Sequence, residues 1–179
     1  MSFIINPDAP SGGGGGKRRP EARAGKKLLW AASIEYGKSN AGNDKIDVRW
    51  VVVDDPDGGT DTTAFVWDTF TLTEKAAWRL QNLARALEQR TSWDASDEDA
   101  TWGIVSRVPV WAELVADTYN GKTRMKVNSY TVFGGEVTDE MEAMVNEAEA
   151  WCRAGKAKNA GRSGGSAAAG VAQDEDIPF

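Results

Sequence analysis

Apolar residues recur at every second position in several segments of this 179-residue chain, which limits the fold to one built largely from β-strands. Successive side chains of a strand point to opposite faces, so this spacing indicates a strand with one buried face. The pattern is clearest in residues 45–54, where one face carries Ile46, Val48, Trp50 and Val52. Residues 28–36 repeat it. Strand-like sequence also covers residues 62–71, 108–119 and 122–133, so we expect five strands.

Turn residues separate most of these segments. Residues 37–44 and 55–61 are rich in Gly, Asn and Asp, and Asn120-Gly121 is a dipeptide typical of tight hairpins. Short connections of this kind join antiparallel neighbours. We therefore expect an antiparallel sheet.

Two segments change from a period of two to the period of a helix. Residues 74–90 form the first, with Thr73 as a candidate cap and an apolar stripe made by Trp78, Leu80, Leu83, Ala84 and Leu87. Residues 138–153 form the second, capped by Thr138, with a stripe made by Met141, Met144, Val145 and Ala148. An acidic loop over 91–101 follows the first helix.

The order of these elements is three strands, a helix, two strands and a terminal helix. This is the order of an OB-fold, a five-stranded antiparallel barrel with a helix between strands three and four. We therefore predict a mainly β domain with helices over residues 28–153. The alternative is an α+β sheet with its helices on one face.

Both ends of the chain have the composition of disordered tails. Residues 1–27 contain five consecutive Gly and six Lys/Arg, which predicts a flexible, Gly-rich, basic arm. Residues 154–173 are mostly Ala, Gly and Ser with a few cations, which predicts a disordered linker. Residues 174–179 form an acidic tip.

The composition also argues against several classes of function. The chain has no His and a single Cys, Cys152, so an internal disulfide or a multi-Cys zinc site is excluded. No apolar run approaches the roughly 20 residues of a membrane span. We expect a cytoplasmic protein that is not an enzyme and needs no cofactor or metal. The alternative is a metal-dependent nuclease using carboxylates such as Asp54, Asp55, Asp57 and Asp97–Asp99, although acids are ordinary in turns.

The last six residues are the most specific signal in the chain: Asp174-Glu175-Asp176-Ile177-Pro178-Phe179. Phe179 offers an aromatic ring and the terminal carboxylate on one residue, which a pocket with an apolar floor and a basic rim can bind. Pro178 reduces the conformational freedom lost on binding. A tethered segment of this kind indicates a docking peptide for partner proteins.

This tip resembles the C-terminal tip of bacterial and phage single-stranded DNA-binding proteins, whose common form is Asp-Asp-Asp-Ile-Pro-Phe. The chain departs from that form only at Glu175. Its Gly-rich arm and acidic body are unlike the standard bacterial member, so it looks more like a diverged phage-encoded relative.

The resemblance implies a protein that binds single-stranded DNA during replication, recombination or repair, in the bacterial cytoplasm. It also implies that the tip recruits a nuclease, helicase, primase or recombination mediator. Members of the family often form dimers or tetramers, so a homo-oligomer is an open alternative.

Single-strand binding requires cations along the backbone and aromatic faces for the bases. Strand 122–133 supplies both if its alternation is regular, on a face made by Lys122, Arg124, Lys126, Asn128 and Tyr130. Arg49, and Trp67 with Phe65, extend this candidate surface. Trp30, Trp50 and Trp78 are expected in the core, and Trp111 is ambiguous.

The charge of the body opposes this interpretation. Residues 28–152 carry eleven Lys/Arg against twenty-two Asp/Glu, whereas DNA-binding domains are usually basic. A DNA-binding body therefore needs its acids, in the 94–99 loop and the 136–149 helix, to lie away from the binding face. An adaptor that displays the tip without touching DNA is the alternative.

Overall fold

A computed structural model describes residues 21–59, 61–119 and 121–163. Its elements in chain order are β1 (Gly25–Lys38), β2 (Asp44–Asp54), β3 (Phe65–Thr71), α1 (Ala77–Ala86), α2 (Glu98–Val105), β4 (Val110–Tyr119), β5 (Lys122–Thr131) and α3 (Asp139–Ser163). The predicted fold class is confirmed: the protein is mainly β, with one five-stranded antiparallel sheet consistent with an OB-like fold.

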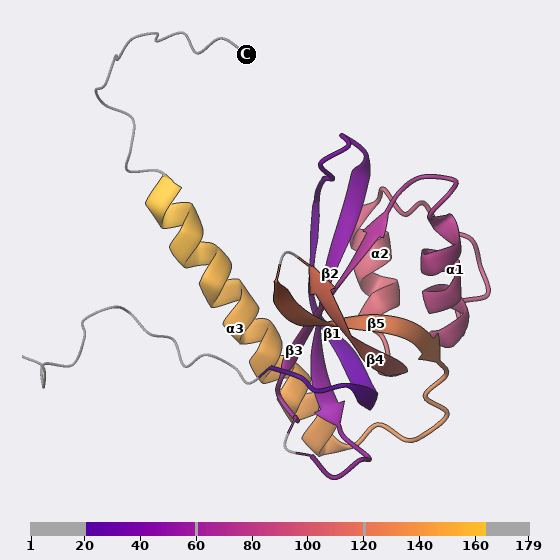
Figure 1. Cartoon of the computed structure of the whole chain (residues 1–179), viewed down its shortest axis with the longest axis vertical. Helices are drawn as coiled ribbons and strands as arrows, with labels where there is room; N and C mark the ends of the chain where they lie inside the picture. Colours follow the sequence, from indigo (N-terminus) through magenta and orange to yellow (C-terminus); the bar gives the residue numbers. More distant parts are fainter. Residues whose placement is uncertain (1–20, 60, 120, 164–179) are drawn as a thin grey trace, which may run out of the picture.

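The sheet has the order β3-β2-β1-β4-β5, and β1 is its centre (Figure 1). Residues Gly25–Leu29 of β1 pair with β4, and Leu28–Lys38 pair with β2. Register irregularities after Leu28 and Ala31 let this long strand serve both neighbours. The sheet is open rather than hydrogen-bonded all the way round, but its two edge strands, β3 and β5, lie in contact.

Helices cover both faces of the sheet. One face of β2 carries Ile46, Val48, Trp50 and Val52, which are buried with Leu83 of α1 and Val105 of α2 in the main core. The other face carries Val51 and Val53, which pack with Val145 and Ala148 of α3. Figure 1 shows α3 on one side of the sheet and α1 and α2 on the other. The alternative with helices on one face is therefore wrong.

The structure corrects the predicted helical segment between strands three and four. It contains two helices, because α2 occupies Glu98–Val105, partly within the expected acidic loop. Asp97 caps α2 by accepting a hydrogen bond of 3.0 Å from the amide of Ala100. The first helix, α1, begins at Ala77 without a side-chain cap, so Thr73 is not its cap. Thr138 does cap α3, accepting from the amide of Met141 at 3.3 Å.

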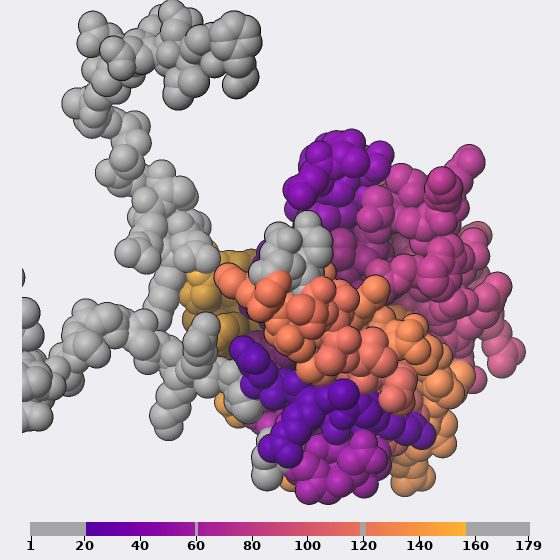
Figure 2. Space-filling model, viewed as in Figure 1, coloured from indigo at the N-terminus to yellow at the C-terminus, as the bar shows by residue number. Residues whose placement is uncertain are grey.

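The structure also shortens both predicted tails. Residues 21–27 belong to the folded domain, since Ala22 and Lys27 are buried and β1 begins at Gly25. Figure 2 shows the start of the described chain, in indigo, lying against the body of the domain. Residues 154–163 continue α3 rather than forming a linker. Residues 1–20, 164–173 and the tip 174–179 lie outside the described residues.

Two of the three tryptophans expected in the core are there. Trp50 is fully buried and Trp30 nearly so, but Trp78 is 57% exposed. Trp78 lies nine residues before Leu87, about two and a half turns at 3.6 residues per turn, so the two project from opposite sides of a helix. Trp78 was therefore wrongly assigned to the buried stripe.

Candidate functional site

A groove of about 930 Å³ runs between the facing edges of β3 and β5. One wall is β3 with Trp151 of α3, and the other is the first half of β5. Its lining residues are Glu21, Ala22, Phe65, Val66, Trp67, Asp68, Thr69, Arg79, Asp117, Thr123, Arg124, Met125, Lys126 and Trp151. We call this the β3–β5 groove. It contains Trp67, Arg124 and Lys126, three of the residues that the sequence predicted for DNA binding.

Trp67 is the aromatic platform of this groove. Its side chain is on the face of β3 opposite Val66 and Phe70, and it is 48% exposed. Arg49 is paired with Trp67 in the β2–β3 register and places its guanidinium carbon 3.8 Å from the ring centroid. This cation–π contact holds the indole ring in place while leaving almost half of it open to solvent.

Arg49 itself is not on the exposed surface where the sequence analysis expected it. Its side chain is only 15% exposed, since it lies beneath Trp67 and α3. It donates to Cys152 Sγ at 3.4 Å and lies 3.8 Å from Glu35. Its geometry fits the support of Trp67 better than direct contact with a phosphate.

The cations of β5 meet the expectation in part. Arg124 and Lys126 are exposed and line the groove, with Arg124 3.8 Å from Asp117 on β4. Lys122 is exposed at the start of β5 but is not among the lining residues.

Tyr130 does not share the face of these cations. The β4–β5 register shifts between Glu113/Leu114, where Val127 and Ser129 are the partners and Asn128 is extra. An extra residue reverses the alternation beyond it. The Tyr130 ring therefore packs against the core, with its centroid 5.8 Å from that of Trp50. Burial, and then the charge of Asp68, raise the pKa of Tyr130.

Asp68 joins the two edges of the sheet beside the groove. It accepts hydrogen bonds of 2.7 Å from the Tyr130 hydroxyl on β5 and 2.7 Å from Nη2 of Arg79 on α1. Burial raises the pKa of Asp68, although both partners oppose the shift. Arg79 also donates to the carbonyl of Thr69 at 2.9 Å. These three residues, Asp68, Arg79 and Tyr130, form what we call the seam.

Arg79 and Trp151 are among the groove residues that the sequence analysis missed. Arg79 follows Trp78 in a helix, where no strand alternation could relate it to β3 or β5. Trp151 lies within the expected second helix and is 40% exposed, with its ring centroid 5.1 Å from that of Phe65. Trp151 is seven residues after Met144, about two helical turns, so its place at the edge of the predicted stripe is a sequence signal that could have identified it.

The groove as a whole is electrically balanced. Its lining contains the cations Arg79, Arg124 and Lys126 and the acids Glu21, Asp68 and Asp117. None of the acids of 94–99 or 136–149 is among the lining residues. Within a body of eleven cations and twenty-two acids, this surface is therefore much less negative than average.

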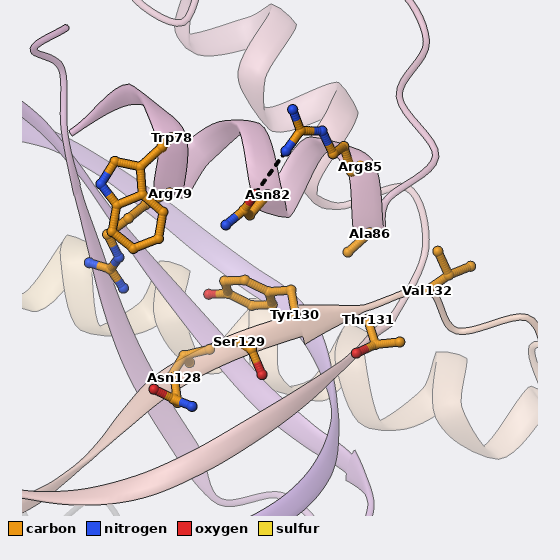
Figure 3. Close-up of a pocket in the computed structure, with 11 residues that line it drawn as sticks. Trp78, Arg79, Asn82, Arg85, Ala86, Asn128, Ser129, Tyr130, Thr131 and Val132 are labelled. Atoms are coloured by element: carbon orange, nitrogen blue, oxygen red, sulfur yellow. Dashed lines mark hydrogen bonds between the residues drawn. The ribbon is translucent and has the colours of Figure 1, made fainter. Parts of the chain in front are cut away.

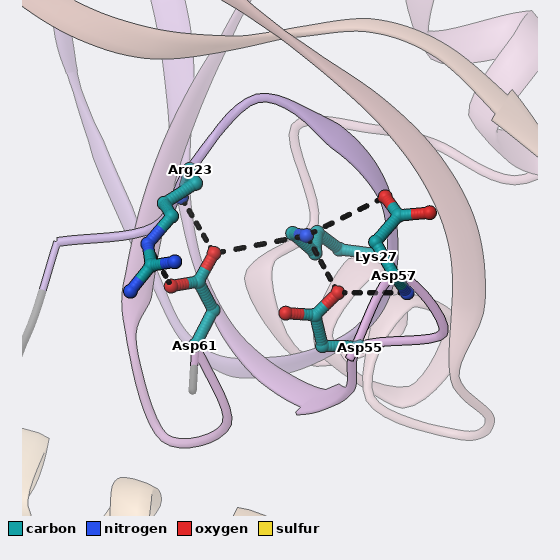
Figure 4. Close-up of polar contacts among 5 residues, drawn as sticks. All are labelled: Arg23, Lys27, Asp55, Asp57 and Asp61. Carbon is teal, nitrogen blue, oxygen red and sulfur yellow. Dashed lines mark hydrogen bonds and ion pairs between the residues drawn. The ribbon is translucent and has the colours of Figure 1, made fainter. Parts of the chain in front are cut away.

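The carboxylates of the nuclease alternative have a different environment (Figure 4). Asp55, Asp57 and Asp61 surround the ammonium of Lys27 at 2.6, 3.8 and 3.7 Å. Asp61 also accepts from the amide of Arg23 at 2.8 Å. We call these residues the loop network. In the described part of the chain, no cluster of three or more acidic or cysteine side chains is placed to hold a metal ion.

Among the helices that the structure describes, none is long and apolar enough to cross a membrane. A scan against protein-family models finds no match to this chain, and a search of curated proteins finds no significant relative.

Proposed function

We propose that this protein binds single-stranded DNA without sequence specificity, through the β3–β5 groove, in bacterial replication, recombination or repair. We further propose that the tip, Asp174–Phe179, recruits partner proteins such as a nuclease, helicase, primase or recombination mediator. The role is binding rather than catalysis, and the compartment is the bacterial cytoplasm.

One observation carries the DNA-binding part of the proposal. Trp67, Arg124 and Lys126 were singled out for their chemistry in segments more than fifty residues apart, and they line one groove. An exposed indole ring can stack on any base, and cations can follow the phosphates, so the pair of features favours binding without sequence readout. Phe65 and Trp151 add aromatic surface to the same groove.

The balanced charge of the groove sets the expected strength of binding. Stacking should contribute a large share of the affinity, because the lining has as many acids as cations. The phosphate contribution should come from Arg124 and Lys126. We therefore expect moderate affinity that falls as salt rises, with a slope of about −0.7 per phosphate neutralised.

Trp fluorescence quenching and gel shifts with an oligonucleotide of about 35 bases test this proposal. The informative variant is Arg124→Ser with Lys126→Ser, and the matched control is Lys38→Ser with Lys75→Ser, which removes the same charge from exposed positions outside the groove. Loss of two phosphate contacts should reduce the salt slope by about 1.4 in the groove variant alone. An equal reduction of the salt slope in both variants would show that the net charge of the protein, and not the groove, determines DNA binding.

The acidic body favours a second candidate function, an adaptor that displays the tip without binding DNA. The same gel shift discriminates, since no shift at low salt supports the adaptor. Deletion of Ile177–Phe179 tests the tip under either function. Capture of partners should be lost, while DNA binding stays intact, because the deletion removes no charged side chain and the terminal carboxylate moves to Asp176. Partner capture that survives the deletion contradicts the recruitment role.

A further inference from the structure

Trp78 does not line the β3–β5 groove, yet its side chain is 57% exposed, more than that of Trp67 or Trp151. A single exposed apolar side chain is ordinary. Here, however, the exposed indole ring lines a second groove, so a ligand in that groove can contact it. This groove has a volume of about 330 Å³ and lies between α1 and the second half of β5.

Figure 3 shows how the two elements build this α1–β5 groove. Trp78, Arg79, Asn82 and Arg85 project from α1 on one side, and Asn128 and Ser129 lie on β5 on the other. The remaining lining residues are Ala86, Val127, Tyr130, Thr131 and Val132. The spacing of 78, 82 and 85 keeps these three side chains on one helix face.

The charge of this groove is unlike that of the body. Its lining contains two arginines, Arg79 and Arg85, and no carboxylate. Arg85 is exposed and is hydrogen-bonded at 3.0 Å to Asn82, a neutral partner, and no ion pair joins it to an acid among the residues that the structure describes. Arg79 is paired with Asp68 in the seam, so Arg85 supplies the positive charge that favours an anionic ligand in this groove.

Arg79 connects the two grooves. Within the described ranges 21–59, 61–119 and 121–163, it is the only residue that lines both of them. The seam fixes its guanidinium through Asp68 and Thr69, and 27% of the side chain remains exposed. The two grooves therefore meet at Arg79, beside the seam between β3 and β5.

We propose that the α1–β5 groove is a second subsite for the same single DNA strand. Bases leaving Trp67 stack on Trp78, and phosphates lie against Arg79 and Arg85. The amides of Asn82 and Asn128 offer hydrogen bonds to base edges or sugars. This inference rests on the proposed function and extends the path of the strand from β3 across the seam to α1.

Oligonucleotide length separates the two subsites. Oligo-dT of about 5 bases should occupy the β3–β5 groove alone, whereas about 15 bases should span both. Trp78→Ala should weaken binding of the longer oligonucleotide about 5-fold or more, with little effect on the shorter one. Trp78→Phe, which retains an aromatic face, should recover part of the loss.

Arg85→Ser tests the phosphate contact, and Arg90→Ser is its control because Arg90 is exposed and lines neither groove. Only the first should lower the salt slope for the longer oligonucleotide. Since both positions are exposed, unchanged melting temperatures should confirm that the variants fold.

The outcomes also separate this inference from the proposed function. If Trp67→Ala weakens binding of both lengths while Trp78→Ala changes neither, the second subsite is wrong and the proposed function stands. If Trp78→Ala weakens both lengths equally, the two-subsite path is likewise wrong. If the unaltered protein binds neither oligonucleotide, the proposed function itself fails.

Discussion

Two buried aspartates of this domain, Asp55 in the loop network and Asp68 in the seam, each pair with a basic side chain. The basic partner of Asp55 is buried, whereas that of Asp68 is partly exposed. Lys27 reaches Asp55 from β1 at 2.6 Å, and both side chains are sealed, at 3% and 1% exposure. Arg79 reaches Asp68 at 2.7 Å from α1, but 27% of its side chain is exposed at two grooves.

The pKa values differ in the same way. The hydrogen bond from Lys27 lowers the pKa of Asp55 despite its burial. Burial raises the pKa of Asp68 despite Tyr130 and Arg79. The buried pair of Lys27 and Asp55 stabilises a loop. The pair of Arg79 and Asp68 leaves part of the Arg79 side chain exposed, where a ligand could contact it. The two clusters, each an aspartate with a cation, therefore differ in position: the first lies buried in a loop, and the second presents Arg79 at the two grooves where we propose that DNA binds.

Lys27→Met should give the largest effect of the predictions. It leaves Asp55 and Asp61 buried without their ammonium, which should lower the free energy of unfolding by about 3–5 kcal/mol. Urea unfolding monitored by Trp fluorescence measures the loss. Adding Asp55→Asn to the variant should restore part of it, because a neutral amide costs less to bury than a carboxylate.

The reference for that experiment is Lys38→Met, which breaks the exposed pair with Asp44 at 2.6 Å. Surface pairs of this type contribute about 0–1 kcal/mol. Comparable losses in the two lysine variants would show that burial does not distinguish the loop network.

Tyr130→Phe should have the next largest effect. It removes only the hydroxyl that donates to Asp68, so it should cost about 1.5–3 kcal/mol, the range for a hydrogen bond to a charged group. Tyr36→Phe is the matched control, because its hydroxyl donates at 2.8 Å to a neutral carbonyl, that of Ala95. That bond should be worth about 0.5–1.5 kcal/mol. An equal loss of unfolding free energy in the two variants would show that the hydrogen bond to Asp68 contributes no more than one to a neutral carbonyl.

The pH dependence of stability should show the smallest effect, with opposite signs at the two aspartates. The pKa of Asp55 lies below its ordinary 3.8 in the folded state. Its contribution is thus present above that value and is lost as pH falls through the folded pKa. The pKa of Asp68 lies above 3.8, so its contribution is present below that value and is lost as pH rises through the folded pKa.

Urea midpoints measured from about pH 3 to pH 7 in Asp55→Asn and Asp68→Asn test these signs. Each slope is limited to about 1.4 kcal/mol per pH unit for one group. In Asp55→Asn, the free energy of unfolding should fall less steeply as the pH is lowered. In Asp68→Asn, the decrease in the free energy of unfolding as the pH rises above 3.8 should disappear. Slopes of the same sign would contradict the comparison.

Much of the fold could be predicted because local rules and burial agreed. The alternation of Ile46, Val48 and Trp50 identified β2 and its core face, as found. Thr138 and the stripe through Val145 identified α3, although the helix continues further than its composition indicated. Trp78 was assigned to the buried side of α1, although its spacing of nine residues from Leu87 already places the two on opposite sides of a helix.

The candidate site was predicted less completely. Trp67, Arg124 and Lys126 were identified by residue type and strand position, and they meet in one groove. Tyr130 was placed on the wrong face, because the irregularity near Asn128 depends on the pairing with β4. The contribution of Arg79 depends on how α1 docks against β3 and β5, which no local pattern records.

The sequence by itself determined the elements with repeated side-chain periods and the chemistry of the aromatic and cationic residues, because those depend on neighbours along the chain. Only the tertiary structure decided which of them meet. The approach of β3 to β5, the bulge that turns Tyr130 inward and the position of Arg79 between two grooves all arise from packing between distant segments. Such contacts are selected by the burial of the whole core rather than by any one strand or helix.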